Sequence, residues 1–585
     1  MGGAGERALS YCRLPNDYQE LTTSFDITPS NASRVWIPDL VERIARHLPP
    51  NELPCTLRLV DKATAALFSG PHHTTVRLSQ PVPHHFFARV WGKPSAMRSL
   101  TMSQRQQLLL RTAASGMTTN LEVLVSSAKH ITVNSEAMEA AASAGHLPTC
   151  LRLRQAGCPW GDALQEAAGA GHLAVCEGLL AAGCPWSWGA LVLAFRAGRL
   201  DVAEGLSKHL PHPPGFMVRS EELLAAAHGC DLAALQSFLD LWQALPVPRL
   251  SGLTLSFIGR RYLCLLIPTA AGSPTPDWQA KVEWLEGLGY QKTASACHAA
   301  AACPDAAARL AWLRGRGYPV DGGTAVRVCA AGDVAALRYL LAEGVRPTEE
   351  AATEAAAGGH LAALQALHAA GCPVSPLDVA CAAAEGGHLA AVAWAVEAFG
   401  AAATLHTPLF ASAALSGNVQ MLAWLRERGC PWDEQAVTNA AEAGDGKALA
   451  WLAERGCPMP AQGEAYVRAA RNGDLQTLAC LRRLGCPWGS TGEVFGLCLD
   501  ARCPLAALRW LAAEGCPVDW RVAAERARAR WDRKAGEGAQ VLAWLEEQRR
   551  LGQGCRAAGS EAPGRRRPWG RLLAVLGCGA APLVK

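Results

Sequence analysis

The stretch TEEAATEAAAGGHLAALQALHAAGCPV, residues 348–374, contains the pattern that decides the fold. An alanine-rich segment ends at two glycines, and His360 restarts the chain with leucines at the three-residue spacing of a helix face. Gly371 then ends the second segment as a left-handed C-terminal cap would, and Pro373 prevents its continuation. The stretch therefore predicts a helix, a tight turn, a second helix and a loop.

The same arrangement recurs along the chain. GCPW stands at residues 157–160, 183–186, 429–432 and 485–488, and the variants GCPV and GCPM stand at 371–374, 515–518 and 456–459. The joint glycines from 371 to 515 lie 27 to 30 residues apart: Gly371, Gly400, Gly429, Gly456, Gly485 and Gly515. Such a period is typical of a solenoid. Because one hairpin cannot bury both of its apolar faces alone, each copy must stack on the next.

The totals limit the class of protein. A chain of 585 residues exceeds the roughly 250–300 residues of one globular core. Half of the residues are hydrophobic and 18% are charged, which excludes a disordered chain. The net charge of +4 is too small to indicate a nucleic acid or a membrane surface as partner. Since no secretory signal or membrane-spanning stretch is visible, we expect an intracellular protein, in the cytoplasm or the nucleus or both.

Cysteine is frequent, with 22 residues, but no C-x-x-C pair occurs, and most joints carry a single cysteine. This favours small buried residues at tight joints over disulfides or zinc. The chain also lacks a phosphate loop, an H-E-x-x-H motif and a G-x-S-x-G motif. We therefore expect no enzyme activity, no cofactor, no catalytic residues and no metal ligands.

An aromatic residue recurs before a leucine in the second helix, at Trp284, Trp312, Tyr339, Trp424, Trp451, Trp510 and Trp544. Its presence in most units favours packing between neighbours, with an exposed apolar stripe as the alternative. The GCPW tryptophans occur in only some copies, so they are the candidate residues for binding a client protein: Trp160, Trp186, Trp432 and Trp488.

A histidine follows the turn glycine in several units, at His146, His172, His360 and His388. Stacked helices lie roughly 8–10 Å apart, so these side chains are too far from one another to share a metal ion. We expect each of them to start its helix with a local hydrogen bond.

The turns carry a family resemblance. AAASAGHL at 140–147 and AAAEGGHL at 382–389, each followed by leucines and a joint glycine, resemble the helical part of the ankyrin repeat. HTPL at 406–409 is similar to the opening of that repeat. Ankyrin repeats have about 33 residues, so the shorter period here implies short or absent β-fingers. The resemblance implies a protein-binding surface.

Residues 33–70 differ from the repeats and predict three short helices. Their apolar positions, with Ile-Pro-Asp at 37–39 and Leu-Pro at 48–49, resemble an F-box, although Ala63 stands where that family usually has tryptophan. The resemblance implies docking onto the adaptor subunit of a cullin-type ubiquitin ligase. The adaptor-binding residues would be Ile37, Pro38, Leu40, Ile44, Leu48, Leu53, Leu57 and Val60. The alternative is a simple cap on the solenoid.

The sequence as a whole predicts an all-α, ankyrin-type helical-hairpin solenoid behind a small three-helix F-box-like module. The expected parts are a disordered N-terminus (1–32), the module (33–70), a connector (71–103), a first stack (104–250), an irregular repeat (251–288), a second stack (289–548) and a disordered basic tail (549–585). The expected function is a monomeric substrate-recognition adaptor of a ubiquitin ligase, with protein partners and without nucleic acid or membrane. The alternative is a repeat scaffold with no ubiquitin role.

Overall fold

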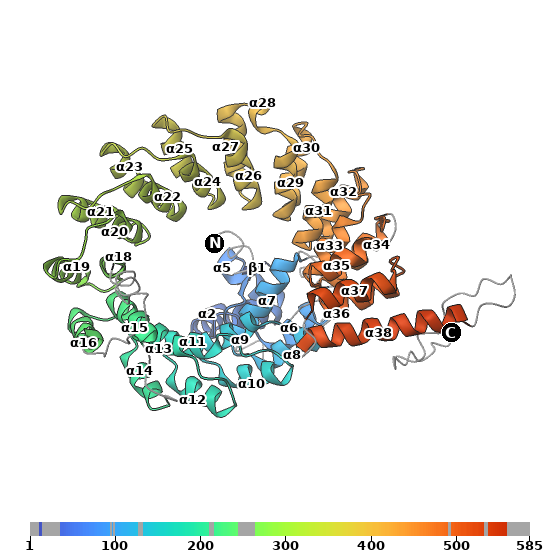
Figure 1. The fold of residues 1–585 in the computed structure, drawn as a ribbon, viewed down its shortest axis with the longest axis horizontal. Helices are drawn as coiled ribbons and strands as arrows, with labels where there is room; N and C mark the ends of the chain where they lie inside the picture. The colour runs from blue at the N-terminus through green and yellow to red at the C-terminus, as the bar shows by residue number, and fades with distance from the viewer. Residues whose placement is uncertain are drawn as a thin grey trace. The chain divides into compact units, whose positions relative to one another are not determined.

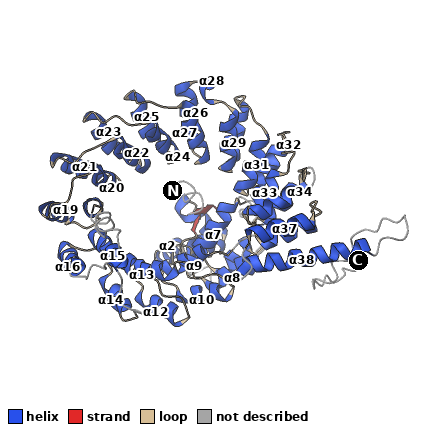
Figure 2. Ribbon diagram, in the orientation of Figure 1, coloured by secondary structure: helices blue, strands red, loops and turns tan. Residues whose placement is uncertain are grey.

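The computed structural model describes residues 11–13, 36–93, 96, 100–126, 133–209, 216–243, 264–489, 493–531 and 536–557. Within these ranges the fold is an all-α helical repeat solenoid, as predicted, with one pair of short strands (Figure 2). The chain divides into two compact units, Met1–Trp488 and Gly489–Lys585. None of the described helices combines the length and the apolar character needed to cross a bilayer.

Unit 1 begins with a small helical module. Its elements are α2 (Pro38–Ala45), α3 (Glu52–Cys55), η4 (Leu57–Leu59), α4 (Lys62–Leu67), α5 (Pro71–Thr74) and α6 (His84–Trp91), and β2 (Thr75–Arg77) pairs antiparallel with β1 (Tyr11–Arg13). Val41, Leu57 and Phe68 form a small core of their own. The side chain of Asn51 is almost fully buried and ties the module to the following loop, donating to the carbonyl of Arg77 and accepting from its amide, both at 2.8 Å.

Helical hairpins follow in series (Figure 1). The first helices of the hairpins are α7 (Met102–Ala114), α9 (Ser135–Ser143), α11 (Ala163–Ala170), α13 (Trp188–Arg196), α15 (Phe216–Gly229), α18 (Leu266–Ala271), α20 (Ala294–Ala300), α22 (Gly322–Ala331), α24 (Glu349–Ala357), α26 (Pro376–Glu385), α29 (Thr407–Leu415), α31 (Glu434–Ala443) and α33 (Glu464–Arg471).

The second helices are α8 (Thr118–Ser126), α10 (Leu147–Gln155), α12 (Leu173–Ala181), α14 (Leu200–Ser207), α16 (Leu232–Gln243), α19 (Trp278–Gly287), α21 (Ala306–Gly315), α23 (Val334–Ala342), α25 (Leu361–Ala369), α27 (Leu389–Phe399), α30 (Val419–Glu427), α32 (Gly446–Glu454) and α34 (Leu475–Arg483). A short extra helix, α28 (Ala401–Thr404), follows α27. First helices pack on first helices and second on second, which gives two layers.

Alanines provide much of the buried surface of the first layer, and leucines much of that of the second. In α24, Ala351 and Ala355 are completely buried, so the first helices of adjacent units can approach closely. In α25, Leu364 and Leu367 are at most 1% exposed and supply the larger apolar area of the second layer. Burial of such side chains between units stabilises the stack by about 1.5–3 kcal/mol per leucine.

The turn inside each hairpin is fixed by contact with the next unit. Gly359 has φ +69°, and a Cβ atom there would lie 2.4 Å from Nδ1 of His388. The Nε2 of His388 donates to the carbonyl of Ala357 at 3.1 Å, and His172 bonds to Ser143 in the same way. The sequence suggested local hydrogen bonds for these histidines; instead, each of the two joins its unit to the preceding one.

The GCP joint ties the end of the second helix to the start of the first helix within one hairpin. Gly429 has φ +76°, and the amide of Cys430 donates to the carbonyl of Leu425 at 3.0 Å, closing α30 as a left-handed cap. The thiol of Cys430 donates to the carbonyl of His406, where α29, the first helix of the same hairpin, begins. Cys158 and Cys457 make equivalent bonds to Asn134 and Asp433. Burial raises the pKa of Cys430 to about 12, so its thiol stays protonated.

Unit 2 contains α35 (Glu493–Asp500), α36 (Leu505–Ala513), α37 (Trp520–Arg530) and α38 (Gly536–Ala557). Its aromatic core brings the ring of Trp520 within 5.7 Å of Phe495 and 5.8 Å of Trp544, centroid to centroid. Helix α38 extends into the predicted tail. The remainder of that tail and most of the predicted N-terminal segment lie outside the described residues.

The irregular repeat is described only in part. Its first part, to residue 263, lies outside the described residues, and the described hairpin consists of α18 and α19. Lys281 on α19 is completely buried and donates to the carbonyls of Ala227 and Cys230 in the preceding hairpin. The predicted domain boundaries remain predictions.

Candidate functional site

The residues predicted to bind a ubiquitin-ligase adaptor do not share one environment. Ile37, Ile44 and Val60 are exposed, by 51%, 38% and 51% of their surface. Pro38 is also exposed, whereas Leu40, Leu48 and Leu53 are half-buried and Leu57 is buried. The structure places part of this set in the core of the module and part on its surface.

The four GCPW tryptophans lie in separate joints, and each packs against a neighbour. Trp160 is buried, and Trp186, Trp432 and Trp488 are half-buried. Trp432 meets the ring of Phe410 at 5.4 Å, and Trp488 stacks on Tyr466 at 4.0 Å. These rings hold the joints together and leave part of their surface open.

Three of these tryptophans are covered by an arginine six residues earlier. The guanidinium carbons of Arg154, Arg426 and Arg482 lie 5.0, 4.2 and 5.4 Å from the ring centroids of Trp160, Trp432 and Trp488. Arg426 also donates to the carbonyl of Cys430 at 3.2 Å. The arginine therefore binds the end of its helix and the face of the joint tryptophan at once.

A second set of pairs lies within the second helices, with the arginine four residues after the tryptophan. Arg316, Arg428 and Arg455 lie 4.8, 3.8 and 4.3 Å from the rings of Trp312, Trp424 and Trp451. This spacing puts both side chains on one face of the helix. The rings of this column are half-buried, so the guanidinium covers the part that the neighbouring repeat leaves open.

Both kinds of pair meet on α30, α32 and α34. We call this surface the arginine–tryptophan edge; it comprises Trp424, Arg426, Arg428, Trp432, Trp451, Arg455, Arg482 and Trp488. Its arginines are exposed, and none has a carboxylate within 4 Å among the described side chains. The rings of Trp432 and Trp451 lie 6.3 Å apart, so the joint of one unit touches the second helix of the next.

The chemistry of this edge is specific. Guanidinium groups form forked hydrogen bonds to phosphate, and they present a flat face on which a planar ring can stack. Indole rings offer the same stacking surface. A repeated array of the two groups, without carboxylates in contact, suits a ligand that alternates anionic groups with aromatic rings.

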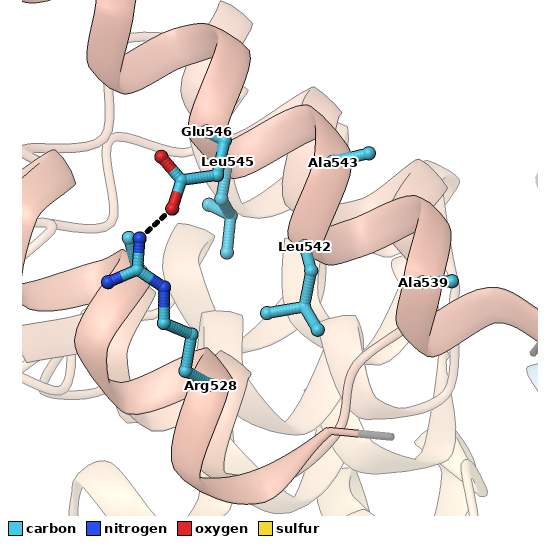
Figure 3. Close-up of a pocket in the computed structure, with 7 residues that line it drawn as sticks. Arg528, Ala539, Leu542, Ala543, Leu545 and Glu546 are labelled. Carbon is cyan, nitrogen blue, oxygen red and sulfur yellow. Dashed lines mark hydrogen bonds and ion pairs between the residues drawn. The ribbon is translucent and has the colours of Figure 1, made fainter. Parts of the chain in front are cut away.

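Two shallow grooves lie elsewhere. One, of about 250 Å³, lies between α37 and α38, where Arg528 forms an ion pair with Glu546 beside Leu542 (Figure 3). The other, of about 260 Å³, lies between two successive joints and is lined by Arg346 and Cys372. No group of three potential metal-ligating side chains occurs among the residues that the structure describes.

No family model matches this sequence, and no curated protein is detectably similar to it. The solved structures with a similar fold include two of the pentatricopeptide repeat protein PPR10 in complex with an 18-nucleotide psaJ RNA element, one of them a triple cysteine-to-serine variant. Each is 14% identical to this chain, with a TM-score of 0.22, and the alignment covers 88% of this chain and 89% of PPR10. At this level the likeness is limited to the general architecture of stacked helical repeats.

This comparison contradicts the function predicted from the sequence. The two structures are neither ankyrin nor F-box proteins, and both are RNA complexes. The prediction of a ubiquitin-ligase adaptor with protein partners and without nucleic acid was therefore wrong. The physical reason is that stacked helical hairpins are common to several repeat families, so Gly-His-Leu turns identify the fold and not the ligand.

The tryptophan columns are visible in the sequence, but the arginines that cover them were not predicted from it. Two spacings carry the signal: arginine four residues after a helix tryptophan, and arginine six residues before a GCPW tryptophan. Where the second spacing fails, as at Trp186 with Leu180 in the arginine position, no such pair is possible.

Proposed function

We propose that this chain is a non-enzymatic helical-repeat protein that binds single-stranded nucleic acid along the arginine–tryptophan edge. The observation that carries the proposal is the recurrence of exposed arginines stacked on tryptophan in three successive repeats. Such proteins bind by combining basic groups that contact the backbone with aromatic faces that stack on bases.

The balance of charge at the edge supports a polyanionic ligand. The last turns of α30, α32 and α34 and the residues directly after α30 and α32 carry five arginines and two glutamates: Arg426, Arg428, Arg455, Arg482 and Arg483, against Glu427 and Glu454. In the equivalent positions of α21, the arginines are already neutralised: Arg314 pairs with Glu343 at 3.0 Å, and Arg316 pairs with Glu283 and Glu286. The two regions differ in the availability of the guanidinium group.

Three side chains of types that often take part in catalysis are engaged in structural hydrogen bonds. The thiol of Cys430 donates to a carbonyl, and His360 and His388 bond to the carbonyls of preceding units. This supports a role in binding without chemistry. The intracellular location expected from the sequence stays a prediction.

Fluorescence anisotropy with labelled single-stranded RNA of about 20 nucleotides tests the proposal, and single-stranded DNA and duplex RNA of the same length distinguish the kind of nucleic acid. The variant Arg428→Gln/Arg455→Gln should bind at least tenfold more weakly, since two arginine contacts with phosphate or base are lost and neither arginine has, among the described residues, a carboxylate partner that its removal would leave unpaired. The matched control, Arg314→Gln/Arg316→Gln, removes the same charge from paired arginines and should stay within about twofold.

Two further measurements make the test decisive. Affinity should fall steeply with salt, because binding releases counterions from the nucleic acid. Heparin, a polyanion without bases, should compete much less well than RNA. The proposal fails if no single-stranded oligonucleotide binds, if both double variants lose the same affinity, or if heparin competes as well as RNA.

A further inference from the structure

Arg105 joins two parts of unit 1 that are far apart in the sequence. It lies on α7, in the first hairpin, and only 2% of it is exposed. Its Nη1 and Nη2 donate to Oδ1 and Oδ2 of Asp474, 369 positions later, at 2.8 and 2.7 Å. Nη2 also donates to the carbonyl of Gly444 at 2.9 Å. The guanidinium group thus binds two successive hairpins, α31–α32 through Gly444 and α33–α34 through Asp474.

Asp474 is fully engaged on its own side as well. It precedes α34, and Oδ1 accepts from the amides of Gln476 and Thr477 while Oδ2 accepts from the hydroxyl of Thr477 at 2.6 Å. Its side chain is 1% exposed. A buried pair of this kind is stable only when the geometry is good and the remaining hydrogen-bonding capacity is used. Both conditions are met here.

The first turn of α7 also contacts sequence-distant hairpins. Thr101 and Gln104 form a capping box that fixes this turn. A Cβ atom on Gly417 would lie 2.8 Å from Cγ2 of Thr101, and one on Gly444 would lie 2.6 Å from Cβ of Met102. The start of α7 therefore lies directly on the turns of the α29–α30 and α31–α32 hairpins (labelled in Figure 1).

Other buried cations in unit 1 make the same kind of bond, but to the adjacent hairpin. Arg309, 5% exposed, donates to the carbonyls of Ala271 and Ser273, at the end of the preceding first helix. Lys281 does the same to Ala227 and Cys230. Arg105 repeats this inter-repeat contact with Gly444, although α7 and α31 belong to hairpins separated by most of the unit.

We propose that the first turn of α7 is a latch that closes unit 1. The pair of Arg105 with Asp474 holds the first hairpin against the hairpins of α31 to α34. Its release lets these hairpins separate while each of them stays folded, because the extensive helix packing of each hairpin is with its sequence neighbours. The latch is independent of the ligand proposed above.

Hydrogen exchange of the full-length protein, followed by mass spectrometry, tests this. In Arg105→Met, amides at both residues 100–114 and residues 474–483 should exchange at least tenfold faster, with residues 349–369 unchanged. The matched control is Arg309→Met, which also removes a buried arginine; it should speed exchange only near residues 264–315. Unchanged exchange at 474–483 in Arg105→Met overturns the latch.

A second pair of variants tests the latch even if Arg105→Met folds poorly. Asp474→Asn keeps an oxygen to accept from the α34 amides but loses the charge that Arg105 binds. Asp333→Asn makes the same change at the start of α23, where Oδ1 accepts from the amide of Ala336 at 3.0 Å and no ion pair is formed among the described residues. Exchange at residues 100–114 should rise in Asp474→Asn and not in Asp333→Asn. An equal response of the two variants, or no response in either, contradicts the proposal.

Discussion

At the scale of single residues, glycine is required in the turns for two separate reasons: a left-handed φ and the lack of space for a Cβ atom. A comparison of Gly359 with Gly371 separates the two. Gly359 has a left-handed φ, and a Cβ there meets His388; Gly371 has a similar φ of +67° with nothing within 4 Å of the Cβ position. A left-handed conformation costs an L-residue about 1–2 kcal/mol.

Gly371→Ala should therefore lower the free energy of unfolding by about 1 kcal/mol. Gly359→Ala should cost about 2 kcal/mol or more, since His388 must also move and its bond to Ala357 is lost. Urea unfolding followed by circular dichroism measures both. Equal losses would mean that the contact with His388 contributes nothing.

The joint cysteines predict a sensitivity to alkali. Cys430 has its pKa raised to about 12 by burial, from an ordinary value of 9.0. Its contribution to stability is present below pH 9.0 and is lost as pH rises through the folded value, because the unfolded chain releases the proton first. The free energy of unfolding should fall between pH 9 and pH 11 by up to about 1.4 kcal/mol per pH unit for this thiol.

Cys430→Ser isolates the effect of this one thiol, since a hydroxyl can still donate to His406 but does not titrate in this range. The variant should lose less stability than the wild type between pH 9 and pH 11, by the amount given above. Parallel curves of stability against pH for the two proteins would contradict the assignment.

At the scale of the element, most of the fold could be predicted because its causes are local. Glycines at 358–359 and 371, proline at 373 and the leucine spacing of α25 set the ends and the buried faces of their helices without reference to distant residues. The candidate site was predicted only in part. The sequence singled out Trp432 and Trp488, but the guanidinium groups above them depend on how each joint folds back on its helix, which no periodicity describes.

At the scale of the whole molecule, a solenoid is nearly one-dimensional, since each hairpin contacts its neighbours and stability is close to a sum over adjacent units. The repeat period predicts those contacts. It does not predict which distant hairpins meet, because Arg105 belongs to no recurrent pattern and Asp474 occupies a turn position that is histidine, asparagine or aspartate in other units as well. The latch is therefore a contact between distant hairpins of unit 1, and the repeat period of the sequence does not predict it.

The ion pair of Arg105 with Asp474 should affect the cooperativity with which unit 1 unfolds. Breaking a buried ion pair by removing one partner costs about 3–5 kcal/mol, because the other charge is left without compensation. Arg105→Met should therefore lower the urea midpoint. It should also broaden the transition, since hairpins no longer held together at a distance can unfold in separate groups, and the apparent m-value then falls. Arg309→Met breaks contacts within adjacent hairpins and should lower the midpoint with little change in m. If the two variants shift the midpoint and keep the same m-value, unit 1 behaves as a simple chain of neighbours and the distant pair adds no cooperativity.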